Sequence, residues 1–287
     1  MGAGADLRHL IAERRPLRLP GTHDAISALV AVDCGFPAIY LGGQALAAST
    51  FGLPDHSIAT PVEFAEEARR IREAVDVPIL CDADEGGSNP LAIQRVVRLF
   101  ERAGIAGAHI EDHEPGKHLH DPSGRLFSTA DMVKRVEAAV DARKSADFVV
   151  IARCDTLLVG RSLGEAVERG LAYAEAGADL IFYTRLPIGE TAAVERLVGR
   201  PLVGVIFDRI ARDQLESSGL SVALYPRQAL LAAIAAIRRV YEGVQSDSLG
   251  AQPLASVDEL LRLTHSPKFV ELARRYGMLP DGAGHFA

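Results

Sequence analysis

Cysteine is scarce in this chain, and so are long apolar runs and tracts of glycine or proline. Only three cysteines occur among 287 residues, each in or beside an apolar run, so we expect reduced, buried thiols and no disulfide framework. The longest apolar runs, such as 230–237, are far shorter than the ~18 residues that a membrane-spanning helix needs. The 26 glycines and 15 prolines are spread over turn positions. These features argue against a disulfide scaffold, a membrane protein and a low-complexity chain.

Positive charge is not in excess either. The formal net charge is -7 at pH 7, and the arginines form no basic block interleaved with aromatic residues, so we expect no nucleic-acid partner. Asp6 stands where a myristoylation signal has Ser or Thr, and no charged-then-apolar leader precedes a cleavage site. We therefore interpret the protein as cytoplasmic and expect no membrane partner.

A short apolar run followed by an amphipathic helix recurs eight times, which is typical of α/β proteins. The runs are nearly continuous, as in strands covered on both faces, and lie at 17–21, 38–42, 79–84, 107–111, 148–153, 180–183, 202–207 and 221–225. Eight units without an internal boundary predict one (β/α)8 barrel. The alternative is an open doubly wound sheet, but 21–24 lack the glycine fingerprint that often follows its first strand. We expect a single domain over 1–287, with a barrel core at about 17–240, extra N-terminal helices and a C-terminal helical extension at about 253–287.

Helix boundaries have clear signals. Capping-box patterns begin helices at 60–63 and 162–165, and Asn-Pro at 89–90 begins another. A further capping box at 256–259 predicts a final helix that runs to about residue 276. Three helices are predicted to end at a glycine, which favours the left-handed conformation that reverses the chain: Gly35, Gly104 and Gly177.

Charged side chains gather where the predicted strands end, which is where a barrel places its active site. Asp82 and Asp84 lie at the end of the third strand, Glu111 and Asp112 at the end of the fourth, and Arg153 and Asp155 at the end of the fifth. Because carboxylates repel one another, we expect a divalent cation to hold them together, and all-oxygen ligands favour Mg2+ over zinc. The alternative is that one or two of these acids cap the next helix or pair with Arg153.

Seven short motifs in a fixed order resemble a known family. They read Tyr-Leu-Gly-Gly at 40–43, Gly-Leu-Pro-Asp at 52–55, Asp-Ala-Asp-Glu-Gly at 82–86, Ile-Glu-Asp at 110–112, Ile-Ala-Arg-Cys-Asp at 151–155, Ala-Gly-Ala-Asp at 176–179 and Leu-Tyr-Pro at 224–226. Over residues 6–240 the chain is similar to the isocitrate lyase and phosphoenolpyruvate mutase superfamily. The resemblance implies a (β/α)8 barrel that uses Mg2+ to bind a small carboxylic-acid substrate, an α-oxo or α-hydroxy acid. It also implies a homodimer or homotetramer, often with the last helix exchanged between subunits.

The resemblance implies a role for each matching residue. Asp82 and Asp84 would hold the metal, with Glu111 supporting it through water. Arg153 would meet a substrate carboxylate, and the backbone amides at Gly42 and Gly43 would face the substrate oxygens. Mg2+ would act as a Lewis acid that stabilises the enolate left when a neighbouring bond breaks.

Two further residues are candidates that the sequence leaves open. Tyr40 is either a catalytic hydroxyl or a core residue. Asp55 lies in a segment of small and turn residues, 52–57, that is either a gate over the site or a simple turn.

The family has a lyase branch and a mutase branch, and this chain lacks the residues that are diagnostic of either. The cysteine that serves as acid/base in isocitrate and methylisocitrate lyases is replaced by Leu119, and the lyase glutamate and asparagine fall at Thr184 and near Val205. The mutase asparagine is missing from 114–121. Lys117 or His120 would then be the proton donor, provided that the loop closes. A zinc site of His113, His118 and His120 is the less favoured interpretation, because their spacing is irregular.

The sequence therefore predicts a Mg2+-dependent lyase that cleaves a carbon–carbon bond in a small 2-oxo or 2-hydroxy acid, like an oxaloacetate decarboxylase or a methylisocitrate lyase. The first alternative is a mutase or hydrolase acting on the carbon–phosphorus bond of phosphonopyruvate or phosphoenolpyruvate, with the carboxyphosphonoenolpyruvate mutases as near relatives. The second is a non-catalytic paralogue that binds an oxo acid.

Overall fold

The computed structural model describes residues 2–13, 16–116, 125–248 and 253–279. The chain forms two compact units, Met1–Leu230 and Leu231–Ala287. The first unit carries every strand found in the described residues.

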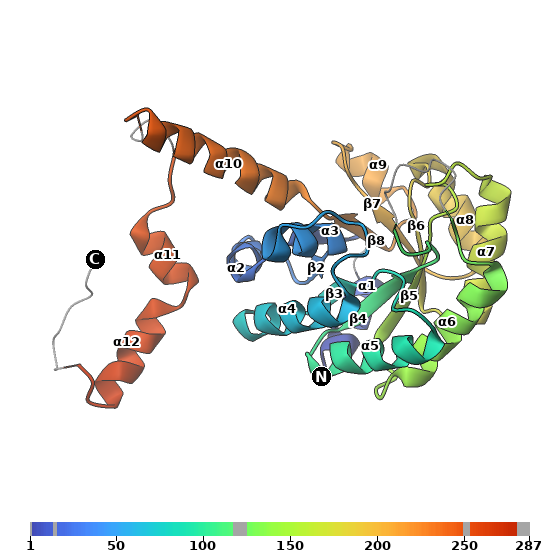
Figure 1. Ribbon diagram of the computed structural model, residues 1–287, viewed down its shortest axis with the longest axis horizontal. Helices are drawn as coiled ribbons and strands as arrows, with labels where there is room; N and C mark the ends of the chain where they lie inside the picture. Colours follow the sequence, from blue (N-terminus) through green and yellow to red (C-terminus); the bar gives the residue numbers. More distant parts are fainter. Residues whose placement is uncertain (1, 14–15, 117–124, 249–252, 280–287) are drawn as a thin grey trace. The chain divides into compact units, whose positions relative to one another are not determined.

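Eight parallel strands close into a barrel in sequence order, so the predicted (β/α)8 fold is confirmed (Figure 1). They are β1 Leu17–Thr22, β2 Ile39–Leu41, β3 Ile79–Asp82, β4 Gly107–Glu111, β5 Val149–Cys154, β6 Leu180–Tyr183, β7 Leu202–Val205 and β8 Val222–Tyr225. β1 pairs with β8 as well as with β2, with Leu17 beside Val222. This pairing excludes the open doubly wound sheet.

The helices between the strands form the outer layer of this unit, and α5, α6 and α7 can be followed around β4 and β5 in Figure 1. The α-helices before β8 are α1 Ala3–Glu13, α2 Ala25–Asp33, α3 Gly43–Leu46, α4 Pro61–Ala74, α5 Pro90–Arg102, α6 Thr129–Ala142, α7 Leu163–Glu175, α8 Thr191–Val198 and α9 Arg212–Glu216. A π-helical turn, η1 Ala47–Phe51, continues α3, and a 3-10 turn, η2 Ile188–Glu190, precedes α8. The predicted caps at Thr60, Asn89 and Ser162 all accept backbone N–H groups, which fixes where α4, α5 and α7 begin.

The barrel is closed at one end by α1. Leu7 and Ile11 of this helix are buried with Leu17 and Leu19 inside the barrel. Gly4 makes this packing close, because a Cβ there would lie 2.5 Å from the carbonyl oxygen of Asp147, before β5. The carboxyl ends of the strands are therefore left to form the opening in which the charged residues meet.

Two details of the sequence analysis are corrected. Cys34 is exposed at the end of α2, whereas Cys81 and Cys154 are buried as expected. The final predicted helix is divided into α11 Val257–Leu263 and α12 Ser266–Arg275, because His265 between them has a φ of 57° and cannot continue a right-handed helix.

The second unit contains most of α10 Gln228–Gln245, together with α11 and α12. Many of its large apolar side chains are exposed, among them Leu231, Ile234, Ile237, Tyr241, Val244, Leu260, Phe269, Tyr276 and Met278. No helix in the described residues has both the length and the apolar character needed to cross a membrane.

Candidate active site

A cavity of about 650 Å³ opens where the barrel strands end. It brings together most of the residues singled out in the sequence, since its lining includes Tyr40, Gly42, Gly43, Asp55, Asp82 and Arg153. Lys117, His118, Leu119 and His120 fall outside the residues that the structure describes. The cavity size is within the usual range for small-molecule sites.

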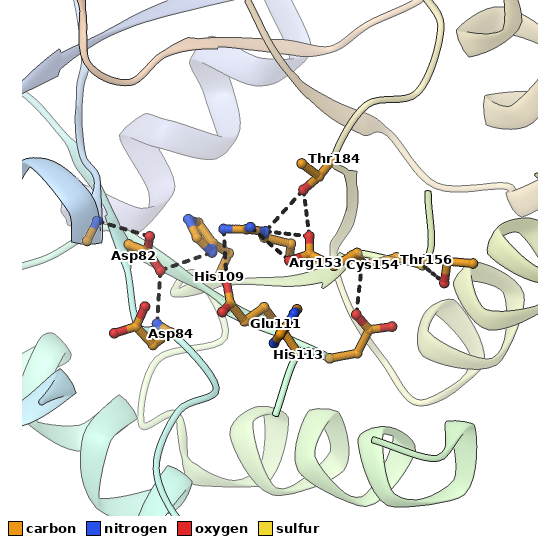
Figure 2. A network of polar contacts seen from close by, with 12 residues as sticks. Asp82, Asp84, His109, Glu111, His113, Arg153, Cys154, Thr156 and Thr184 are labelled. Atoms are coloured by element: carbon orange, nitrogen blue, oxygen red, sulfur yellow. Dashed lines mark hydrogen bonds and ion pairs between the residues drawn. The ribbon is translucent and has the colours of Figure 1, made fainter. Parts of the chain in front are cut away.

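Three buried carboxylates converge beside this cavity. Asp82 ends β3, Asp84 follows it, and Glu111 ends β4, and each offers an oxygen within 4.8 Å of the others. All three side chains are buried, and Figure 2 shows Asp82 and Asp84 side by side with Glu111 next to them. Like charges held this closely in a low dielectric raise the free energy of the folded state unless a cation joins them. The described residues thus provide the hard oxygen ligands that Mg2+ prefers.

The backbone around Asp82 fixes the orientation of its carboxylate. Oδ2 accepts a hydrogen bond from the Gly43 N–H at 3.0 Å, and Oδ1 accepts one from the Asp84 N–H at 2.9 Å. Asp84 adopts a φ of 47°, which bends the chain sharply after β3 and ends the strand two residues earlier than predicted. The Gly43 amide therefore orients the Asp82 carboxylate, and its contact with substrate oxygens stays a prediction.

Gly43 also leaves the room that the acidic cluster needs. A Cβ at this position would lie 3.0 Å from Asp82 Oδ2 and 3.3 Å from Asp84 Oδ1. A side chain there would push into the space between the two carboxylates. The absence of a side chain at Gly43 thus preserves the geometry of the acids.

Arg153 on β5 is the cation nearest to the acids. It forms ion pairs with Glu111 at 2.8 Å and with Asp155 at 2.8 Å, and its Nε also donates to Thr184 Oγ1 at 3.1 Å (Figure 2). Burial by itself would lower the pKa of this guanidinium, but the Asp155 and Glu111 carboxylates outweigh burial and raise the pKa. Arg153 therefore stays charged and holds two buried carboxylates, while it also lines the cavity.

His109 is a residue of the site that the sequence analysis missed. It lies on β4 two residues before Glu111, so both side chains point to the same side of the strand. Its Nε2 shares a 2.8 Å hydrogen bond with the Tyr40 hydroxyl, and its Nδ1 lies 3.5 Å from Asp82 Oδ1. The Tyr40 ring is buried among the residues inside the barrel, and Tyr40 also lines the cavity. The ring of Tyr40 thus packs in the core, while its hydroxyl lies near the acids through its contact with His109.

Asp112 points away from the cavity, because successive side chains of a strand alternate between its two faces. Its carboxylate accepts hydrogen bonds from the Asp155 N–H and the Tyr173 hydroxyl, each at 2.8 Å, and forms an ion pair with Arg169. Burial, followed by the charge of Asp155, raises the pKa of Asp112 to about 6. Cys154 lies nearby on the same outer side, and burial raises the pKa of its thiol well above the ordinary value. This cluster holds the ends of β4 and β5 together, and its thiol is inert.

Asp112→Asn is expected to remove a pH dependence of stability. The native pKa of about 6 lies above the ordinary value of 3.8, so between these pH values the native protein binds a proton that the unfolded chain has released. The free energy of unfolding therefore falls as pH rises from about 4 to about 6, by up to about 3 kcal/mol from this group. Urea unfolding at pH 4.5 and 6.5 in EDTA measures the slope. The exposed Asp213→Asn on α9 should keep the wild-type slope, and an unaltered slope in Asp112→Asn would contradict the assignment.

The remaining histidine candidate gives no zinc site in the described residues. His113 is buried, and its Nδ1 is 2.8 Å from the carbonyl oxygen of Glu114. Within the described part of the chain, Asp82, Asp84 and Glu111 form the one group of three or more acidic, histidine or cysteine side chains with the spacing of a metal site. His118 and His120 lie outside that part.

Comparison with known proteins shows the family to which the chain belongs. The sequence model of the phosphoenolpyruvate phosphomutase family matches residues 7–245. The chain is 34% identical to 2,3-dimethylmalate lyase of Eubacterium barkeri over 88% of this chain and 89% of that protein. It is 36% identical to 2-methylisocitrate lyase of Escherichia coli (strain K12) over 85% of each. A structure of phosphonopyruvate hydrolase in complex with oxalate and Mg2+ is similar with a TM-score of 0.86 and 29% identity, and covers 96% of this chain and 99% of that one. The chain therefore belongs to the phosphoenolpyruvate mutase family, and so to the isocitrate lyase and phosphoenolpyruvate mutase superfamily of enzymes.

Proposed function

We propose that this protein is a Mg2+-dependent lyase that cleaves a carbon–carbon bond in a small 2-oxo or 2-hydroxy carboxylic acid. The observation that carries the proposal is the convergence of three buried carboxylates beside the cavity. Two relatives that match most of the chain are named as lyases of dimethylmalate and methylisocitrate, and a similar structure holds oxalate with Mg2+.

The residues present fit a magnesium ion. Asp82 and Asp84 would bind it through their carboxylates, and Glu111, which is paired with Arg153, would support it through water. Mg2+ bound there would supply a Lewis acid that stabilises negative charge developing on a substrate oxygen. Gly43 holds Asp82 in place through its backbone N–H.

Proton transfer is assigned to residues around the cavity. The Tyr40 hydroxyl, oriented by His109, lines the cavity and could give a proton to the carbon from which the bond has broken. Lys117 and His120 are alternative proton donors, and both lie outside the described residues. Asp55, in the 52–57 segment, lines the cavity and is a further candidate catalytic residue. Arg153 keeps its proton and holds Glu111, and it is also the proposed contact for a substrate carboxylate.

The positions where lyases of this superfamily are expected to carry a glutamate and an asparagine have taken other roles. Thr184 donates to Asp155 at 2.6 Å and accepts from Arg153, and Val205 contributes an apolar side chain to the cavity wall. Together with Leu119 in place of the lyase cysteine, this arrangement favours a substrate whose bond breaks without a strong proton donor at position 119, such as a β-oxo acid that loses carbon dioxide.

The test is pyruvate release from oxaloacetate and from methylisocitrate in Mg2+, followed by coupling to lactate dehydrogenase. The rate of pyruvate release measured with Asp84→Asn is subtracted as the background that free Mg2+ causes. We expect pyruvate from one of the two acids well above this background. Pyruvate equal to the background from both acids would contradict the proposal.

Carbon–phosphorus chemistry is the second candidate, because the matching family model is that of a phosphomutase and phosphonopyruvate hydrolase has a similar fold. It predicts inorganic phosphate or phosphoenolpyruvate as products. A non-catalytic paralogue would instead bind oxalate in the presence of Mg2+ and turn over neither class of substrate.

We also propose that the protein is a cytoplasmic homodimer or homotetramer in which α10 contacts a second copy of the chain. Leu231, Ile234, Ile237, Tyr241 and Val244 recur every three or four residues, so they share one face of α10, and all are exposed. A charge placed on this face should disfavour its burial in an interface. Tyr241→Glu is expected to lower the sedimentation coefficient to that of a smaller species, whereas Glu242→Gln should not, and an oligomer that persists in Tyr241→Glu would contradict the proposal.

A further inference from the structure

The wall of the cavity opposite the acids is basic. In a closed eight-stranded barrel β7 lies four strands from β3 in either direction, so the residues that follow β7 face Asp82 across the opening. Arg185 follows β6 and Arg227 follows β8, and both line the cavity on either side of Phe207, which follows β7. Two guanidinium groups therefore flank the part of the cavity farthest from the acids.

These two arginines differ from Arg153 in having no acidic partner among the residues that the structure describes. Arg153 is neutralised by Glu111 and Asp155. No ion pair joins Arg185 or Arg227 to any acid in the described chain, although Asp208 lines the same wall. With two guanidinium groups and one carboxylate, this wall carries a net positive charge toward the cavity.

Arg185 is held in an unusual backbone conformation. Its φ is 65°, a left-handed value that costs free energy in any residue with a Cβ. A glycine would adopt it without strain, yet the chain has a long basic side chain there. Strained residues of this kind concentrate at ligand sites, where the surrounding structure holds them in place.

Arg227 is fixed by its neighbours. Its guanidinium carbon lies 4.5 Å from the centre of the Phe207 ring, a cation–π contact. The Gln228 side chain donates to the carbonyl oxygen of Ile206 at 2.7 Å and accepts from the Arg227 N–H at 3.2 Å. The segments after β7 and β8 are thereby tied together, so Arg227 is positioned before any ligand binds.

The cavity has room for a ligand that reaches from one wall to the other. Its volume of about 650 Å³ corresponds to roughly 20 water molecules at about 30 Å³ each, more than a three-carbon acid at the metal site would fill. We infer that Arg185 and Arg227 form a second anion-binding subsite that receives a distal carboxylate of the substrate. Arg185 and Arg227 would therefore select, among the acids of the proposed reaction, those that carry a second carboxylate at the far end. This inference rests on the proposed function for the end of the substrate that lies beside the acids.

The test compares two five-carbon acids that differ at the far end. 2-Oxoglutarate carries a distal carboxylate and 2-oxopentanoate does not, and calorimetry in Mg2+ gives the affinity of each. We expect the wild type to bind 2-oxoglutarate at least about tenfold more tightly, because charge-assisted hydrogen bonds to arginine are strong. In the double variant Arg185→Met, Arg227→Met this preference should fall below about threefold. Arg196→Met, an exposed arginine on α8, should keep it.

Oxalate, which is too short to reach the second wall, separates the two proposals. The affinity for oxalate in Mg2+ should be equal in the wild type and the double variant. A wild type that does not bind oxalate in Mg2+ would contradict the proposed function and not the second subsite. A wild type without the preference, or a double variant that retains it, would overturn the second subsite. If the methionine at 185 prevents folding, Arg185→Gly suits the positive φ and is expected to lose the preference in the same way.

Discussion

Asp84→Asn is expected to lower Mg2+-dependent turnover by about 1000-fold or more and to leave the protein folded. The carboxylate that would bind Mg2+ is lost, and with it several kcal/mol of charge stabilisation in the transition state. Asparagine keeps the shape of the side chain and tolerates the left-handed backbone at this position. Removal of one of three neighbouring negative charges also relieves repulsion. We therefore expect the melting temperature in EDTA to stay the same or to rise.

The control for Asp84→Asn is Asp76→Asn, which changes the same chemical group on a fully exposed side chain. Its activity and its melting temperature should match the wild type. Full activity in Asp84→Asn would remove this residue from the metal site. A large fall in melting temperature in EDTA would show that Asp84 serves the fold and not the metal.

Arg153→Met is expected to destabilise the protein by about 3–5 kcal/mol at pH 7 in EDTA. The substitution leaves Glu111 and Asp155 buried without their cation, and the cost of an uncompensated buried charge is of this order. In the variant, burial and mutual repulsion raise the native pKa values of these carboxyls above their unfolded values. Below neutral pH the native variant then binds more protons than its unfolded chain, so stability should recover as pH falls from 7 toward 5.5.

Urea unfolding at both pH values measures this effect, and Arg161→Met is the matched control. Arg161 is half-exposed and pairs with Glu165 at 2.8 Å on the surface, where such pairs contribute about 1 kcal/mol or less. A loss below about 1 kcal/mol in Arg153→Met would mean that the buried acids do not depend on this arginine.

The barrel and its acidic site could be predicted because both follow from short sequence patterns. Apolar runs and capped helices alternate along the chain, and each run ends in polar residues at the edge where a barrel opens. This rule predicts a cluster that includes Asp82, Asp84 and Glu111, and the family resemblance assigns these three to the metal. The structure brings them within 4.8 Å of one another.

Other features depend on direction or on distant contacts. Asp112 was grouped with the cavity acids, but the alternation along β4 turns it outward to Tyr173. The same alternation could have identified His109, which shares the face of Glu111 and meets Tyr40 from another strand. The positive φ of Arg185 follows from tertiary structure. At His265 a signal was present, because Pro267 in the first turn of α12 is typical of a helix start.

The most direct measurement of the central claim is a Mg2+ titration of pyruvate release in protein freed of metal with EDTA. The account predicts no turnover above the Asp84→Asn background without metal and saturable recovery as Mg2+ is added, with oxalate as an inhibitor only when Mg2+ is present. Turnover that persists in EDTA, or recovery equal in the wild type and Asp84→Asn, would contradict the assignment of Asp82, Asp84 and Glu111 as the metal site.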